Sequence, residues 1–141
     1  GTKCGTLFGE ALVVTNRELL TNLFPLVKQH GALLAKGRLL GVQFGVLFRD
    51  GLYESIGEHA VRLAIKLREA FRSAGYEVVK ESPTNQQFFR LPNSVIDRLR
   101  ETISFDYWGP RGENDSVVRF VTSWATRDID VDTLIAAINK K

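Results

Sequence analysis

The hydrophobic pattern of the chain changes its period at Gly75, and this change restricts the fold more than any other feature. Before it, apolar residues from Leu52 to Phe71 recur at three-and-four spacing, which predicts a long amphipathic helix ended by Gly75. After it, the pattern predicts strands at 76–80 and 86–91, a helix from Asn93 or Ser94, strands at 104–108 and 116–124, and a last helix from about Thr126 or Asp128. This order predicts an α+β fold, in which helices cover one face of a mainly antiparallel sheet.

The first 48 residues carry further apolar segments. The run 9–15 predicts a buried strand, and Asn16 is placed to cap a helix that Pro25 then interrupts or restarts. Residues 32–48 are apolar nearly all round, which predicts a helix buried against several neighbours. One face of that helix carries a glycine at every fourth position, namely Gly37, Gly41 and Gly45. This stripe predicts close packing against another helix of the chain or against another subunit, so a homo-oligomer (dimer or tetramer) is one interpretation.

Composition excludes several classes of protein. The formal charge is +3 with basic and acidic residues interspersed, so no basic stripe indicates nucleic-acid binding. Cys4 is the only cysteine, which excludes an internal disulfide and a cysteine-based zinc site and fits a reducing compartment. The most apolar stretch, 31–48, is broken by Lys36, Arg38 and Gln43, which leaves too short an uninterrupted apolar run to span a bilayer. We therefore expect a cytoplasmic protein without a membrane partner. Because methionine is absent, we also expect that something has been removed from the N-terminus.

Lys3 is the first candidate for chemistry. It lies among small residues in Gly1-Thr2-Lys3-Cys4-Gly5, just ahead of the apolar run 9–15. Glycines let the backbone approach a ligand closely, and a desolvated lysine loses its charge readily and attacks carbonyl groups. Lys3 is therefore a candidate to form a Schiff base with a carbonyl cofactor. The alternative is a solvated lysine in a frayed chain end.

Arg119 is the second candidate. In the predicted strand 116–124 it shares a face with valines and a serine, whereas the other face takes Val118, Phe120, Thr122 and Trp124. A guanidinium in such a setting needs an anion because it cannot be neutralised by losing a proton. Its planar fork suits a carboxylate, either of a substrate or of a structural Asp or Glu on a neighbouring strand.

Four segments of the chain carry a family resemblance. They are Gly1-Thr2-Lys3 with Gly9-Glu10-Ala11-Leu12-Val13, His30-Gly31-Ala32-Leu33-Leu34-Ala35-Lys36-Gly37, Ser82-Pro83-Thr84-Asn85-Gln86, and Arg119-Phe120-Val121-Thr122-Ser123-Trp124-Ala125-Thr126. In this order and spacing they resemble the C-terminal part of the threonine aldolase and β-eliminating lyase family. Members of that family have the aspartate-aminotransferase fold and use pyridoxal phosphate.

The resemblance implies a domain division and a set of site residues. Residues 1–48 would be the last strand and linking helices of a truncated fold-type I large domain, and 49–141 would be the C-terminal small α+β domain. Lys3 would be the lysine that bonds covalently to pyridoxal phosphate, with Lys28 near the cofactor. Arg119 would hold the α-carboxylate of the amino-acid substrate.

The same resemblance restricts the roles that other residues can have. The family histidine that stacks on the cofactor belongs upstream of Gly1, so neither His30 nor His59 is assigned that role, and His59 is expected on a helix surface. Cys4 departs from the more polar residue expected after the lysine. No metal site is expected.

The activity implied is the cleavage of L-threonine, or allo-threonine, to glycine and acetaldehyde. Two alternatives stay open: an eliminating lyase of the same family, which would release pyruvate and ammonia, and a non-catalytic α+β module for binding or oligomerisation. Because most groups that bind the cofactor would lie upstream, we expect this chain alone to be catalytically poor.

Overall fold

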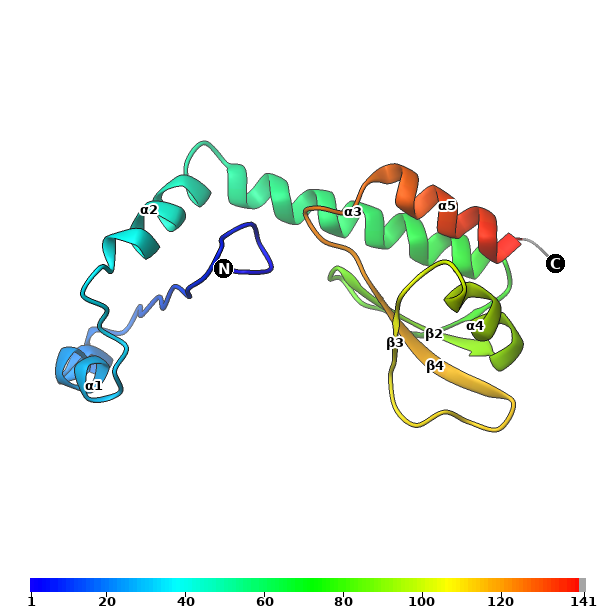
Figure 1. Cartoon of the computed structure of the whole chain (residues 1–141), viewed down its shortest axis with the longest axis horizontal. Coiled ribbons are helices and arrows are strands. Elements are labelled where there is room, and N and C mark those ends of the chain that lie inside the picture. The colour runs from blue at the N-terminus through cyan, green and yellow to red at the C-terminus, as the bar shows by residue number, and fades with distance from the viewer. Residues whose placement is uncertain (140–141) are drawn as a thin grey trace. The chain divides into compact units, whose positions relative to one another are not determined.

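A computed structural model of the chain describes residues 1–139 (Figure 1). The chain divides into two compact units, Gly1–Tyr53 and Glu54–Lys141, called unit 1 and unit 2 below. The boundary falls near the start of a long helix, α3 (Leu52–Ser73). The assignment of residues 1–48 and 49–141 to two domains of a larger enzyme stays a prediction. None of the helices within residues 1–139 has both the length and the apolar character needed to cross a membrane.

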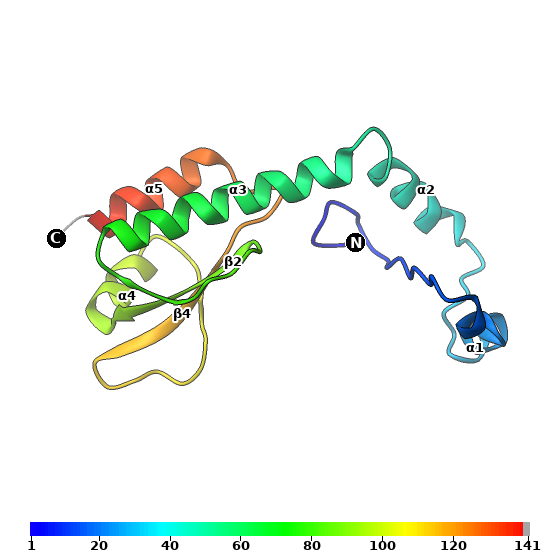
Figure 2. The same ribbon diagram turned by 180° about the vertical axis from the view of Figure 1, so that it is seen from behind.

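Unit 2 is the α+β layer that the sequence predicts. Its strands are β1 (Glu77–Lys80), β2 (Gln86–Pro92), β3 (Asp106–Tyr107) and β4 (Asp115–Val121), and its later helices are α4 (Asn93–Arg100) and α5 (Asp128–Asn139). The strands lie in the order β1-β2-β4-β3, with every neighbouring pair antiparallel. Helices α3 and α5 run side by side along the sheet, with α4 next to them, as both ribbon views show (Figures 1 and 2).

All three helices contribute to one core with the sheet. The buried side chains come from one face of each element, at the spacing expected from the sequence. They are Leu63, Leu67 and Phe71 of α3, Phe89 and Leu91 of β2, Ile96 and Leu99 of α4, Val118 and Phe120 of β4, and Val131, Leu134 and Ile138 of α5. Phe71 stacks on Phe89 with ring centroids 4.1 Å apart. Gly75 ends the turn after α3 with φ +86°. Glycine adopts this left-handed backbone conformation without strain.

The register of β2 and β4 gives the sheet a second, outer face in unit 2. Phe89 pairs with Val118 and both are buried, whereas the adjacent pair Phe88 and Arg119 is only partly buried. Because strand side chains alternate, Arg119 points away from the core and the helices. The predicted division of residues between the two faces of β4 is therefore confirmed.

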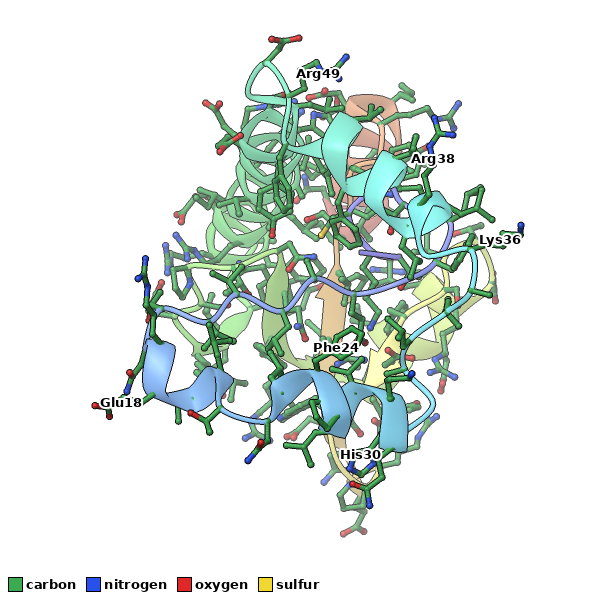
Figure 3. The ribbon with its side chains drawn as sticks, turned by 90° about the vertical axis from the view of Figure 1, so that its left-hand side faces the viewer. Glu18, Phe24, His30, Lys36, Arg38 and Arg49 are labelled. Carbon is green, nitrogen blue, oxygen red and sulfur yellow. The ribbon has the colours of Figure 1, made fainter. Side chains whose placement is uncertain are left out.

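Unit 1 consists of short elements joined by irregular chain. They are a 3₁₀ helix η1 (Arg17–Leu20) and helices α1 (Leu23–Gln29) and α2 (Arg38–Leu47). The Asn16 side chain caps η1 by accepting from the Glu18 N–H at 3.0 Å, as predicted. Pro25 lies in the first turn of α1, where a missing N–H costs nothing. In Figure 3 the charged side chains of Glu18, Lys36 and Arg38 extend outward from unit 1.

Several sequence predictions for both units are wrong or too long. Residues 9–15 form no strand, because within residues 1–139 no segment pairs with them. The helix expected over 32–48 is shortened to α2, and Leu47 is its only buried residue among those described. In unit 2, the strand expected at 104–108 shrinks to the two residues of β3. In each case the apolar pattern is present, but a pattern does not supply the neighbour that a strand or a buried helix requires.

Candidate functional site

The predicted site residues are divided between the two units. Lys3 and Lys28 lie in unit 1, and Arg119 lies in unit 2.

Lys3 is exposed at the tip of a tight turn formed by residues 2–5. The Gly1 carbonyl accepts from the backbone N–H groups of Cys4 (3.0 Å) and Thr6 (3.1 Å), which closes the turn. Gly5 takes φ +100°, in the region that favours glycine. The glycine-flanked setting predicted for Lys3 is thus present. Its amine is open to solvent, however, so the chain's own residues do not supply the desolvation expected.

Helix α2 holds the loop that carries Lys3. The Gln43 side-chain oxygen accepts from the N–H of Leu7 at 2.7 Å and of Phe8 at 3.4 Å. At Gly9, with φ +97°, an added Cβ would lie 2.4 Å from a methyl carbon of Leu40, so only glycine lets the loop approach the helix this closely. The role of Gln43 is not predicted from the sequence, because a polar residue in an apolar segment does not indicate a partner 36 positions away.

Thr6 lies on the same loop and is 8% exposed. Among the described residues, its hydroxyl oxygen has no hydrogen-bond partner. A buried hydroxyl without a partner costs free energy. The loop that carries Lys3 therefore contains a buried hydroxyl whose hydrogen-bonding capacity is unused within residues 1–139.

Lys28 lies in the last turn of α1 and is exposed. Its ammonium nitrogen lies 6.0 Å from the centroid of the Phe24 ring, one turn earlier on the same helix. This contact is local and involves no anion. The assignment of Lys28 to the cofactor site stays a prediction.

Arg119 lies at the centre of a polar and aromatic cluster on the outer face of unit 2. Its Nη2 donates to Asp106 Oδ2 at 2.6 Å, across the β3–β4 pair, and its Nη1 donates to Gln86 Oε1 at 3.3 Å on β2. The guanidinium carbon lies 5.3 Å from the Trp108 ring centroid, and Phe88 packs edge-on against that ring. The structural carboxylate considered as an alternative partner is therefore present, and it is Asp106.

The loop after β4 is fastened to α3 by side-chain hydrogen bonds. Thr122, 4% exposed, donates its hydroxyl to the Ala60 carbonyl at 2.6 Å. His59 is half-buried rather than on the surface, and its Nε2 lies 2.7 Å from the Thr126 carbonyl, to which it must donate. Arg62 donates to both oxygens of Asp128, at 2.9 and 3.0 Å.

These hydrogen bonds fix the strand end that carries Arg119. The hydrogen bonds from Arg62 hold the pKa of the Asp128 carboxyl below its usual range. No sequence pattern predicts these contacts, because they join residues more than 60 positions apart.

No family model matches the chain. It is 30% identical over 127 residues to a low specificity L-threonine aldolase of Pseudomonas aeruginosa, covering 89% of this chain and 36% of that protein. It is 29% identical over 141 residues to a low specificity L-threonine aldolase of a Pseudomonas species, strain NCIMB 10558, covering 98% of this chain and 39% of that protein. Among solved structures, a threonine aldolase of Leishmania major matches with a TM-score of 0.91 and 36% identity, over 97% of this chain and 40% of that one.

This chain is similar to the C-terminal part of a threonine aldolase. The family resemblance inferred from the sequence is confirmed, and so is the α+β fold of the C-terminal domain. The chain spans less than half the length of the threonine aldolases that it matches. The similarity to the Leishmania threonine aldolase covers nearly the whole chain and so includes elements of both units.

Proposed function

We propose that this chain supplies the cofactor lysine and the carboxylate-binding arginine of a pyridoxal-phosphate-dependent threonine aldolase. The observation that carries this proposal is the match to the Leishmania threonine aldolase, at 36% identity over 97% of the chain. The substrate would be L-threonine or allo-threonine, and the products glycine and acetaldehyde.

Side chains of unit 1 carry the chemical groups that suit an aldehyde cofactor. Lys3 presents an exposed primary amine, which is the group that bonds to an aldehyde, on a turn where glycines leave room for a ligand. Thr6 adds a hydroxyl without a partner on the same loop. When bound, pyridoxal phosphate withdraws electrons from the α-carbon of an amino acid.

The chain's own residues would then bind and orient the substrate. Lys3 would hold the cofactor and give it up to the incoming amine. Arg119 would bind the α-carboxylate by paired hydrogen bonds, which fixes the orientation of the bond that is broken. Lys28 is proposed near the cofactor, where its charge would suit a phosphate.

Borohydride reduction tests the role of Lys3. In an intact enzyme that contains this chain, reduction in the presence of pyridoxal phosphate followed by peptide mapping should place the cofactor on Lys3. Lys3→Ala should abolish that label, whereas Lys36→Ala, which removes another exposed lysine of unit 1, should leave it unchanged. A label on any other lysine, or none, contradicts the proposal. Release of pyruvate and ammonia instead of glycine would indicate the eliminating lyase.

We also propose that the enzyme is a homo-oligomer, with α2 at an interface. Apart from the chain neighbours and the backbone of α2 itself, no heavy atom of unit 1 lies within 4 Å of a Cβ added at Gly41 or Gly45, so unit 1 supplies no helix that packs closely on these glycines. Leu39, Val42 and Val46 of the same helix are exposed as well. A size that stays monomeric at high protein concentration would contradict this proposal.

A further inference from the structure

We propose that Asp106 is an internal counter-ion of Arg119 that a ligand carboxylate must displace, and that Asp106 thereby weakens the binding of that carboxylate. This inference rests on the proposed role of Arg119 and adds a residue that controls affinity. It is carried by the way in which the two side chains meet on the outer face of unit 2.

The contact between Asp106 and Arg119 uses one oxygen and one nitrogen. A guanidinium has five N–H donors, and its Nε and Nη2 share the edge on which a carboxylate binds with both oxygens. Asp106 Oδ2 occupies Nη2 at 2.6 Å, while Nε is shielded from water and has no acceptor among residues 1–139. The edge suited to a carboxylate is therefore only half used, and its other half carries the cost of a buried, unpaired donor.

Two other arginines of unit 2 differ in this respect, whereas Arg90 contacts Glu77 and Asp115 through one oxygen each. Arg62 donates to both oxygens of Asp128, and Arg111 donates to both oxygens of Asp97 at 3.0 and 2.8 Å. Paired arginine and carboxylate groups frequently make such a two-oxygen contact. The single-oxygen contact at Arg119 is therefore the weaker and more readily exchanged arrangement.

Asp106 is also the partner that can leave. Its side chain is 65% exposed, against 28% for Arg119, and it lies on β3, a two-residue strand at the edge of the sheet. When Asp106 turns into water, the Nη1 bond to Gln86 and the packing against Trp108 still hold the guanidinium in place. We expect a ligand carboxylate then to take Nη2 together with Nε, which the departure of Asp106 must uncover.

Nuclear magnetic resonance of the 141-residue chain tests this exchange. The probe is sodium acetate, titrated against sodium chloride at constant ionic strength, and the signal is the Hε–Nε resonance of Arg119, assigned by its loss in Arg119→Lys. Acetate should move Hε downfield in a saturable way as the unpaired N–H gains an acceptor. Asp106→Asn keeps an acceptor oxygen but removes the charge, and should lower the Kd for acetate about fivefold, the size expected for one partly solvated charge pair.

Controls separate this inference from the proposed function. Asp97→Asn removes the same charge from another arginine of unit 2 and should leave the Kd at Arg119 unchanged. Asp106→Ala, at an exposed position, should tighten acetate binding as Asp106→Asn does. Unchanged or weaker binding in both Asp106 variants would overturn the role of Asp106 while leaving Arg119 as a carboxylate site. No saturable shift in the wild-type chain or in either variant would overturn both the counter-ion and the proposed role of Arg119.

Discussion

Two adjacent phenylalanines test the register that places Arg119 on the outer face. Phe89 is fully buried, stacked on Phe71 at 4.1 Å and tilted against Phe120 at 5.9 Å. Phe88, one position earlier on β2, is partly buried and meets Trp108 edge-on at 5.0 Å. Because a slip of one residue moves every side chain of a strand to the opposite face, the two positions must respond very differently to truncation.

The expected magnitudes follow from burial. Phe89→Ala removes a ring that is completely enclosed and leaves a cavity, which costs about 4 kcal/mol of the free energy of unfolding. Phe88→Ala loses only a partly buried ring and one edge contact, which costs about 1 kcal/mol. A unit of this size is expected to have a free energy of unfolding of roughly 4–13 kcal/mol. Phe89→Ala should therefore remove a large part of the stability of unit 2.

Urea unfolding followed by tryptophan fluorescence measures both variants. Trp108 and Trp124 both lie in unit 2, and the chain has no other tryptophan, so the signal follows that unit alone. With a slope of about 1.5 kcal/mol per molar urea, Phe89→Ala should lower the midpoint by about 2.5 M and Phe88→Ala by less than about 1 M. The unfolding of Phe88→Ala is also followed by far-UV circular dichroism, because the lost ring contacts Trp108 and its removal can change the fluorescence signal itself. Equal losses, or the reverse order, would refute the register and with it the outward position of Arg119.

Two further predictions concern the loop after β4. Thr122→Val keeps the shape of the side chain but removes the buried hydrogen bond to the Ala60 carbonyl, and should cost about 1 kcal/mol in the same urea assay. Because Arg62 lowers the pKa of Asp128, that carboxylate stabilises the folded state above its unfolded pKa of about 3.9, and the contribution is lost as the pH falls through the lower folded pKa. The melting temperature of unit 2 should therefore fall as acid is added below about pH 4, and less steeply in Asp128→Asn; equal pH dependence of the two proteins would contradict this assignment.

Unit 2 could be predicted largely from the sequence because its burial is local to that unit. The spacing of Leu63, Leu67 and Phe71 identified the inner face of α3, and alternation along β4 placed Arg119 opposite Val118. These periodic patterns are set by residues that pack against one another within the same unit. The ends of the elements were less well predicted, because hydrogen bonds such as that of Thr122 to α3 end a strand without leaving a pattern in the sequence.

Unit 1 was predicted less well for a physical reason. The run 9–15 has the composition of a strand, yet Leu12 and Val13 are 76% and 81% exposed, and no strand pairs with them in the described part of the chain. Composition indicates that a segment suits a sheet, but backbone pairing makes the strand. The same limit applies to α2, whose glycine stripe indicates a close neighbour without identifying it. In contrast, the turn around Lys3 depends on local glycine conformations, and it forms as the sequence suggested.

Arg119 shows why the two sequence interpretations of a strand arginine are compatible. A guanidinium on a sheet face needs an acceptor at all times, because it stays charged at any pH at which the protein is folded. A site that binds a carboxylate only in the presence of substrate must therefore hold a replacement when substrate is absent. An exposed aspartate on a short edge strand meets that need at low cost, since water accepts it when it is displaced. The presence of Asp106 is thus no argument against a ligand at Arg119, and its single-oxygen contact is what such a replacement would be expected to make.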